Sequence, residues 1–545
     1  MSLNDIDHIA INSDPRANLL KKIGYTLANR PNLNFLWDRL KNKKQRMDIE
    51  GQLAMTIPEQ PFSGEVHAIE HHLAHLYSAF YVSPFEEAVT VSVDGFGDFS
   101  SGAWGVGRGR DITVDGRVFF PHSLGIFYQA LTQYLGFPHY GDEYKVMGLA
   151  PYGKPKYLQK MREIVLLDDD GGYRLNLDYF RHHKEKAAFE WQGGAPVFGN
   201  LFSPKLTELL GPMRGPDDKL LQEHKDIAHS IQAMYEEAFF NLLNKLHEKY
   251  GLEAVTLSGG CAMNSVANGK VVQRTPFKQV YIQAAAGDAG GAIGSAFAVW
   301  NGLASNKSHS ISGNATDAPS ERFSMNHAYW GPSFSNETIG ILLQSKAQLI
   351  EKEGCTVERI DSEDLLCMRA AQAVTDGMVV GWFQGRLEWG PRALGNRSIV
   401  CDPRRNDMKE ILNTKIKRRE SFRPFAPSVL REMVSEWFEQ DGEVPFMMKV
   451  FQIREEKRAK IPAVTHADGS GRLQTVSKAT NSRYYKLIEA FKEMTGVPMV
   501  LNTSFNENEP VVCKPEEALD CFLRTKMDML VMENYIVSRK KSSDS

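Results

Sequence analysis

His71–Asp98, which reads HHLAHLYSAFYVSPFEEAVTVSVDGFGD, is the stretch that decides the fold and the chemistry to expect of the chain. His71 and His75 are four residues apart, and this spacing places both imidazoles on one face of a helix. Two neutral imidazoles on one helical face can hold a divalent metal. The stretch therefore predicts a helix that carries part of a metal site.

The second half of this stretch predicts a strand, EAVTVSVDG, that delivers Asp94 to a glycine-rich turn ending at Asp98. Such a turn brings a carboxylate and exposed backbone N–H groups close together, and backbone N–H groups bind phosphate. Isolated HxxxH pairs are mostly incidental, so the pair alone is weak evidence for a metal. Together with the aspartate turn, it predicts a metal site beside a phosphate site.

Length and composition indicate a large globular protein. The 545 residues suggest two or three domains, and 42% hydrophobic with 24% charged residues is ordinary for a chain with sizeable cores. The formal net charge of −3 argues against non-specific nucleic-acid binding, which needs a basic surface.

The six cysteines are scattered and none forms a CxxC pair, so we expect neither a disulfide framework nor a structural zinc site. The N-terminus has acidic residues where a signal peptide needs basic ones, and no apolar stretch approaches the length of a membrane span. We therefore expect a cytoplasmic protein that acts at no membrane.

Two further strand-to-helix segments predict anion or metal contacts. EAVTLSGGCAMN ends a strand in Ser258-Gly259-Gly260, where exposed N–H groups and a helix start favour phosphate. In VYIQAAAGDAGG, Asp288 stands where a helix of small residues begins. Asp288 is either the N-cap of that helix or a third metal ligand, and the segment by itself favours the cap.

Other segments are predicted from pattern alone. Residues 139–153 read as a loop and 165–224 as irregular, whereas 225–250 has the apolar stripe of a long helix. Residues 304–326 are rich in Ser, Asn and Pro and predict a linker, with a domain boundary near 330–345.

The second half of the chain concentrates arginines in short loops. Three of them lie among glycines in residues 385–398, and residues 415–430 add five more cations. Arginine forks bind phosphate and carboxylate bidentately, so the loops indicate a polyanion pocket. The alternative is a set of surface salt bridges, but the interleaved Gly, Pro and Phe favour tightly folded loops.

Taken in order, these segments resemble the carbamoyltransferase family, which includes nodulation protein U and the enzymes that carbamoylate antibiotics. The motifs that carry the resemblance are HHLAH (71–75), VSVDGFGD (91–98), YKVMGLAPYG (144–153), LSGGCAMN (257–264), GDAGG (287–291), GRLEWGPRALGNRS (385–398), FRPFAP (422–427) and LNTSFN (501–506).

The resemblance implies an α/β protein of two domains. Residues 1–335 would form an actin/hexokinase-like carbamoyl-transfer domain, and residues 336–545 a YrdC-like domain that forms carbamoyl adenylate. In the family, carbamoyl phosphate and ATP, the latter with Mg²⁺, are the substrates of that step. The other domain binds a divalent metal, usually iron (Fe²⁺), and passes the carbamoyl group to a hydroxyl or amine of a small molecule. A homodimer is a possible assembly.

The resemblance also implies site residues. His71, His75 and Asp288 would be metal ligands, and Asp94 would lie on the metal or next to the reacting centre. Contacts to the nucleotide or carbamoyl adenylate would come from Ser258, Gly259, Gly260 and Asn264. The carbamoyl phosphate and ATP pocket would contain Arg386, Arg392, Arg419, Arg423, Arg472, Asn502 and Ser504.

The N-terminus departs from the family pattern. Family members usually have two strands before the segment that resembles IDHIAINSDP, with which this chain begins. We therefore expect the first domain to lack its first strands and to expose an unpaired sheet edge. Either the true start lies upstream, or another chain supplies the strands, or the transfer site is impaired.

Two other functions are compatible with parts of the sequence. An actin/hexokinase-like small-molecule kinase would share the aspartate and glycine turns, would release ADP, and would give no role to the arginine loops. A non-catalytic nucleotide- or metal-binding homologue would bind ATP without turnover.

Overall fold

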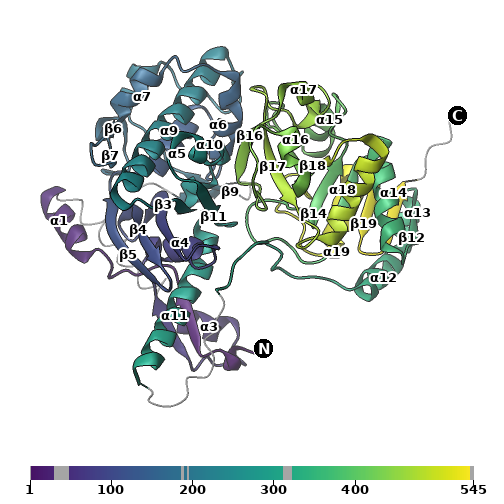
Figure 1. Cartoon of the computed structure of the whole chain (residues 1–545), viewed down its shortest axis with the longest axis horizontal. Helices are drawn as coiled ribbons and strands as arrows, with labels where there is room; N and C mark the ends of the chain where they lie inside the picture. Colours follow the sequence, from purple (N-terminus) through teal and green to yellow (C-terminus); the bar gives the residue numbers. More distant parts are fainter. Residues whose placement is uncertain (1, 30–47, 186–188, 193–194, 311–321, 540–545) are drawn as a thin grey trace. The chain divides into compact units, whose positions relative to one another are not determined.

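The computed structural model describes residues 2–29, 48–185, 189–192, 195–310 and 322–539 (Figure 1). The chain divides into two compact units, which are described separately. Unit 1 comprises residues 1–264 and 271–325, and unit 2 comprises residues 265–270 and 326–545.

Unit 1 is built on a five-stranded mixed sheet of order β11-β10-β3-β4-β5. Its strands are β3 (Glu87–Gly97), β4 (Ser100–Arg108), β5 (Asp111–Phe119), β10 (Ala254–Ser258) and β11 (Gln279–Ile282). The pairs of β10 with β3 and with β11 are parallel, and β3, β4 and β5 pair antiparallel. Residues 88–93 of the central strand β3 are all buried, because β10 and β4 flank this strand and helices pack against it.

The helices of unit 1 follow in chain order. They are α1 (Leu19–Asn29), α3 (Ile49–Thr56), α4 (His71–Phe80), α5 (Leu124–Tyr134), α6 (Glu143–Leu149), α7 (Leu158–Ile164), α8 (Pro204–Leu210), α9 (Gln222–Tyr250) and α11 (Asp288–Ser310), with α10 (Ser265–Arg274) divided between the units. The predicted helix over 225–250 is confirmed as α9, which ends at Gly251 in a left-handed C-cap.

Three two-stranded sheets complete unit 1. They are the parallel pair β1 (His8–Ile11) and β2 (Glu65–Ala68), and the hairpins β6 (Val165–Leu167) with β7 (Tyr173–Leu175) and β8 (Phe189–Gln192) with β9 (Ala195–Phe198).

Several segment predictions in unit 1 are wrong. The predicted linker 304–326 begins inside helix α11, which continues to Ser310, and its residues 311–321 lie outside the described residues. Residues 139–153 contain helix α6, because Val146 and Leu149 bury an apolar side at helical spacing that the charged neighbours hide in the sequence. The stretch 165–224 also contains two hairpins and helix α8. The strands of these hairpins are too short to give a clear alternation of apolar and polar residues in the sequence.

Unit 2 is built on a nine-stranded mixed sheet of order β12-β20-β19-β13-β14-β18-β15-β17-β16. The strands are β12 (Cys355–Arg359), β13 (Val380–Phe383), β14 (Arg397–Cys401), β15 (Ala426–Leu430), β16 (Lys449–Gln452), β17 (Ser470–Val476), β18 (Met499–Ser504), β19 (Met529–Met532) and β20 (Tyr535–Arg539). Only β13 with β19 and β15 with β17 pair in parallel; the other described pairs are antiparallel.

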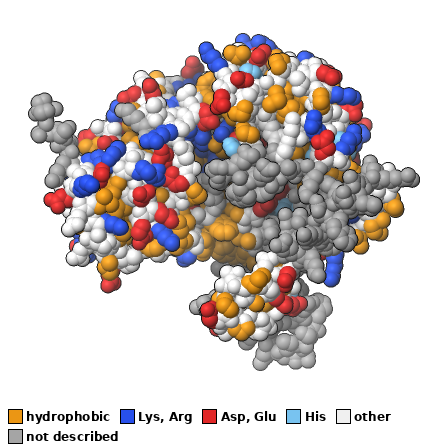
Figure 2. Space-filling model, turned by 180° about the vertical axis from the view of Figure 1, so that it is seen from behind, with side chains coloured by type: hydrophobic (Ala, Val, Ile, Leu, Met, Phe, Trp, Pro, Cys, Tyr) orange, Lys and Arg blue, Asp and Glu red, His pale blue; other side chains and the backbone are white. Residues whose placement is uncertain are grey.

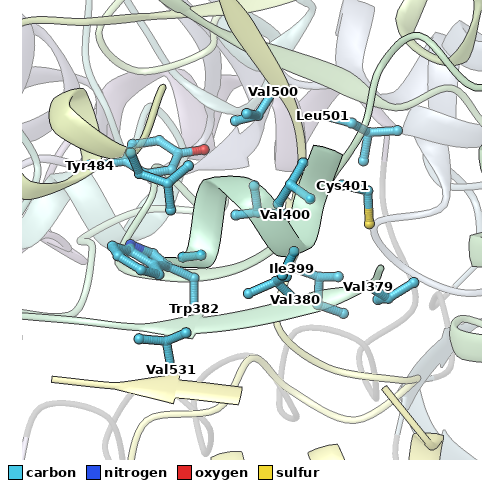
Figure 3. Packing of buried hydrophobic residues seen from close by; sticks show 14 of the residues in the cluster. Val379, Val380, Trp382, Ile399, Val400, Cys401, Tyr484, Val500, Leu501 and Val531 are labelled. Atoms are coloured by element: carbon cyan, nitrogen blue, oxygen red, sulfur yellow. The ribbon is translucent and has the colours of Figure 1, made fainter. Parts of the chain in front are cut away.

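The helices of unit 2 are α12 (Asn336–Ser345), α13 (Ala347–Lys352), α14 (Glu363–Thr375), α15 (Met408–Ile411), α16 (Val434–Trp437), α17 (Glu455–Arg458), α18 (Ser482–Thr495) and α19 (Pro515–Thr525). Figure 3 shows the core that results, where Trp382 of β13, Ile399 of β14 and Tyr484 of α18 are among the buried side chains. The segment DLLCMRAAQAVTDG forms most of α14, and MVVGWFQG contains β13.

The two sheets make this an α/β protein. Acidic and basic side chains are interspersed over the described part of the face that Figure 2 shows. Among the described residues, no helix combines the length and the apolar character needed to cross a membrane.

Candidate functional site

The first histidine of the candidate site stands at the start of helix α4. Glu70 caps this helix, because its carboxylate accepts the backbone N–H of Leu73 at 2.9 Å and also pairs with Arg117 at 2.9 Å. His71 and His75 lie one turn apart on the helix, as the spacing predicts, and their Nε2 atoms are 3.1 Å apart.

The structure brings four donor side chains of unit 1 together: His71, His75, Asp94 and Asp288. Their ligand atoms all lie within 4.8 Å of one another. Asp94 Oδ2 is 2.8 Å from His75 Nε2 and 3.4 Å from His71 Nε2. Asp288 Oδ1 is 3.7 Å from His75 Nε2 and 3.6 Å from His71 Nε2.

Asp94 reaches the histidines from strand β3, but not through the turn that the sequence predicts. The strand continues through the glycines to Gly97, with an irregular register after Val93, and the reversal falls at Asp98 and Phe99, both with positive φ. The prediction of a glycine-rich turn at Asp94 is therefore wrong. A β-bulge absorbs the extra residues and lets the strand run on.

The carboxylate of Asp98 stabilises this reversal. It accepts the backbone N–H groups of Asp14 at 2.7 Å and of His71 at 2.9 Å. Gly97 lies against the ring of His71, where an added Cβ would come within 2.0 Å of the imidazole. These residues of the DGFGD motif thus position a histidine.

Asp288 is the first residue of helix α11, and its carboxylate approaches the two imidazoles. The sequence segment alone favours an N-cap for this residue. The structure instead puts its side chain in the four-residue cluster, where the family resemblance expects it. The segment alone could not show this, because α11 and α4 are about two hundred residues apart in the chain.

The surroundings of His71 select the ring nitrogen that faces the cluster. Nδ1 lies 3.3 Å from the backbone carbonyl oxygen of Asn12, which can only accept, so Nδ1 carries the proton. Nε2 therefore presents its lone pair to the cluster, the arrangement that a carbonyl contact gives to metal-binding histidines. No sequence signal identified Asn12.

In the cluster, the attraction between oppositely charged side chains outweighs the cost of burying their charges. Burial opposes a charged imidazole at His75, but Asp288 and Asp94 raise its pKa to about 9. Burial also opposes the Asp94 carboxylate, and the two histidines nevertheless hold its pKa well below its usual range. Since the protonated imidazole substitutes for a cation, the site is built to hold positive charge.

The four residues fit a divalent transition metal. Two imidazole nitrogens and two carboxylate oxygens form a donor set that iron, manganese and zinc accept. Glu70, Asn12 and Asp98 hold the helix start and the His71 ring in place, so the donors are preorganised.

Of the residues expected to contact the nucleotide, Gly260 lies beside the cluster. A Cβ added to Gly260 would lie 2.9 Å from Asp94 Oδ1, and Gly259 has a φ of +83° that favours glycine. The side chains of Ser258 and Asn264 contact protein groups: Ser258 Oγ donates to Val91 O at 3.4 Å, and Asn264 forms an amide pair with Gln232 at 2.9 and 3.1 Å.

In unit 2, four of the expected arginines lie close enough to repel one another. Burial lowers the pKa of the Arg472 guanidinium well below its usual range, and Arg392, Arg419 and Arg423 lower it further. The Nε atom of Arg472 is buried and has no hydrogen-bond partner in the described part of the chain. A polyanion would relieve this concentration of positive charge.

The remaining three expected residues of unit 2 have structural contacts. Arg386 donates to Gly331 O at 2.9 Å and to Trp330 O at 2.7 Å, so its guanidinium holds a neighbouring segment. Asn502 Nδ2 donates to Ala393 O at 3.0 Å, next to Arg392 on the same loop. Ser504 Oγ donates to Asn506 Oδ1 at 2.7 Å.

Lys417, counted among the cations of residues 415–430, and Glu388, to which the sequence assigned no role, also lie in this region. Lys417 Nζ donates to Asn506 O at 2.7 Å and Oδ1 at 2.6 Å, and also contacts Ser504. Burial lowers the pKa of Lys417 well below its usual range, and Arg419 lowers it further. Glu388 Oε1 accepts the backbone N–H groups of Leu394, Asn396 and Arg397 at 2.8, 2.8 and 3.2 Å. The buried carboxylate shapes the loop that carries Arg392.

Comparison with known proteins identifies the class. The family model of the carbamoyltransferase N-terminus matches residues 7–297 of this chain. The family model of the carbamoyltransferase C-terminus matches residues 371–539. The chain belongs to the carbamoyltransferase family and is a carbamoyltransferase, as the motifs predicted.

The relatives are similar over different shares of their length. The chain is 42% identical to the uncharacterized protein sll1178 of Synechocystis over 86% of this chain and 76% of the relative. It is 38% identical to the nodulation protein NolNO of Sinorhizobium fredii over 91% of this chain and 67% of the relative. It is also 31% identical to 3'-hydroxymethylcephem-O-carbamoyltransferase of Streptomyces clavuligerus, over 46% of this chain and 42% of the relative. The expectations of an actin/hexokinase-like and a YrdC-like domain stay predictions.

Proposed function

We propose that the protein is an ATP-dependent carbamoyltransferase that works in two steps. In unit 2, carbamoyl phosphate is hydrolysed to carbamate and phosphate, and the carbamate oxygen attacks the α-phosphate of ATP, which carries Mg²⁺, to give carbamoyl adenylate and pyrophosphate. Unit 1 then passes the carbamoyl group to a hydroxyl or amine of a small-molecule acceptor. The proposal goes beyond family membership in naming the activated intermediate, the substrates and the division of work.

The observation that carries the proposal is the group of like-charged arginines around Arg472. Free carbamate is a poor electrophile, and adenylation gives it a good leaving group. Holding carbamoyl phosphate and ATP in one pocket brings several negative charges together, and Arg392, Arg419, Arg423 and Arg472 supply the positive charge that this needs. A kinase that bound its nucleotide at unit 1 would give these arginines no role.

The second step is assigned to the cluster of unit 1. A divalent metal held by His71, His75, Asp94 and Asp288 would supply Lewis-acid polarisation of the carbamoyl oxygen. Asp94 has a second carboxylate oxygen, Oδ1, which accepts the backbone N–H of Gly95 at 2.7 Å. We assign to Asp94 the removal of the proton from the acceptor, because a carboxylate held in one orientation can serve as a general base.

The acceptor is proposed from chemistry and from the relatives. A carbamoylated hydroxyl is the product that the name of the cephem relative describes. We therefore expect a small molecule with a nucleophilic hydroxyl, and an amine is the alternative.

Substitutions in the two units test the division of work. Arg472→Met should abolish pyrophosphate release from carbamoyl phosphate and ATP, because it removes a charge from the arginine cluster. His75→Ala should retain that release and lose only transfer to an added acceptor. Arg369→Met is the matched control in unit 2, since Arg369 is an exposed arginine whose guanidinium pairs with Glu358 at 3.0 Å.

The roles would be wrongly divided if His75→Ala abolished pyrophosphate release to the same extent as Arg472→Met. Retained ATP binding without turnover in the wild type would favour a non-catalytic homologue, and ADP as the nucleotide product would favour a kinase.

A further inference from the structure

We propose that His8, Glu65 and His67 form a second metal site, for a divalent transition metal such as Zn²⁺, at the beginning of the β1–β2 pair. One donor atom from each residue lies within 4.8 Å of the others. The inference concerns a different part of unit 1 from the four-residue cluster, and it holds whether or not the proposed function is correct.

The register of the two strands places these side chains on one face. β1 and β2 are parallel, and His8 is the direct partner of Glu65. His67 follows Glu65 by two residues on β2, so both point to the same side of the strand. Directly opposed and diagonal neighbours on one face are within reach of long side chains. The grouping thus follows from the backbone pairing and not only from the rotamers.

The separations of the donor atoms suit a tetrahedral metal. His8 Nδ1 lies 2.9 Å from His67 Nε2, and His67 Nε2 lies 3.8 Å from Glu65 Oε2. Ligands at about 2.0–2.1 Å from a tetrahedral Zn²⁺ are about 3.3 Å from one another. The two distances bracket this value, so small side-chain rotations would give the required geometry.

The chemistry of the donors also favours a metal. Two imidazole nitrogens that face each other can share only one proton in a hydrogen bond, whereas a metal ion accepts both lone pairs. Two imidazoles and a carboxylate are a donor set that zinc commonly accepts. The Glu65 side chain is 69% exposed, which leaves room for a water molecule as the fourth ligand.

The position of the site indicates what the metal would do. An isolated pair of strands is marginally stable, and a metal that joins His8 to β2 would fix the register of this pair. β1 runs directly into Asn12, whose carbonyl oxygen accepts from His71 Nδ1. β2 leads within three residues to His71 itself. The second metal would therefore hold in place the backbone that orients His71.

Metal counting in the full chain tests the proposal. The starting variant is His75→Ala, in which metal binding by the four-residue cluster is weakened. After its metal has been removed, the binding of Zn²⁺ to this variant is measured by equilibrium dialysis. We expect the His75→Ala chain to retain one tight Zn²⁺ that depends on His8. Adding His8→Ala should weaken its binding about tenfold or more.

A second pair of variants keeps the test independent of any one substitution. Glu65→Gln should weaken Zn²⁺ binding in the same background, whereas Glu59→Gln, the same change at another exposed carboxylate, should not. Zn²⁺ should also raise the Tm of the His75→Ala chain and not that of the His8→Ala, His75→Ala chain. The proposal is overturned if the His75→Ala chain binds no Zn²⁺, or if His8→Ala and Glu65→Gln leave its affinity unchanged.

Discussion

At the scale of single residues, the candidate sites contain charged side chains whose protonation depends on the charges of the neighbouring side chains. His75 is held cationic by two carboxylates, whereas Arg472 is surrounded by other arginines. The sequence predicted the histidines and aspartates of unit 1 and the arginines of unit 2, because these residues lie in short motifs. It could not predict their partners, since Asn12 acts through its carbonyl oxygen, which every residue possesses.

The like-charge environment of Arg472 predicts a gain in stability when its charge is removed. Arg472→Met should raise the free energy of unfolding of unit 2 by about 1 kcal/mol, because it relieves repulsion and the burial of an unpaired Nε. Thermal unfolding would show a higher Tm with pyrophosphate release abolished. Arg369→Met should change neither property measurably. A lower Tm in Arg472→Met would show that the arginine stabilises the fold.

A buried histidine outside both sites predicts part of the acid sensitivity of unit 1. Burial lowers the pKa of His182 to about 4, and its Nε2 donates to Pro121 O at 2.8 Å. The ordinary pKa is about 6.5, so below pH 6.5 the unfolded chain binds a proton that the folded chain does not. The contribution of His182 to the free energy of unfolding is therefore fully present above pH 6.5 and is lost as the pH falls toward 4. This loss is at most about 3 kcal/mol.

His182→Gln should remove that pH dependence. Denaturant unfolding at pH 7 and at pH 4.5 should show a smaller difference in the variant than in the wild type. An equal difference in both chains would mean that other groups cause the acid sensitivity.

At the scale of elements, strands and helices with clear apolar patterns were predictable, and the path of the chain at Asp94 was not. α4 and α9 agree with their predictions, since His71 and His75 lie one turn apart on α4 and the apolar stripe of α9 is buried. The DGFGD segment was predicted as a turn from its glycines, but Gly97 is needed for the close approach of His71. A sequence does not show which of these two reasons explains a glycine.

The turn after β10 gives a test at this scale. Gly259 has a φ of +83°, and an added Cβ would lie 2.3 Å from Val93 O on the adjacent strand. Gly259→Ala should cost about 3 kcal/mol or more, because backbone strain adds to a clash with the central strand.

Gly251→Ala is the matched control. Gly251 also has a positive φ, +66°, at the end of α9, but nothing lies within 4 Å of an added Cβ. Gly251→Ala should lower the free energy of unfolding by only about 1 kcal/mol, which is the penalty of the left-handed conformation alone. Equal losses of stability in the two variants would show that the approach to Val93 does not constrain residue 259.

At the scale of the whole molecule, the resemblance of ordered motifs predicted more than any single segment. The pair His71 and His75 alone was compatible with chance, and Asp288 alone favoured a helix cap. The fold brings these residues together from α4, β3 and α11, and it gathers the arginines of unit 2 from loops and β17. Spacing within one element could not show either grouping, because each depends on contacts between distant segments.

The central claim is that this carbamoyltransferase activates carbamoyl phosphate by adenylation. The most direct test is to incubate the purified full chain with carbamoyl phosphate, ATP and Mg²⁺ and to measure phosphate, pyrophosphate and the nucleotide product. The account predicts release of phosphate and pyrophosphate, with AMP as the final nucleotide. Folded protein that releases no pyrophosphate, or that yields ADP instead of AMP, would contradict it.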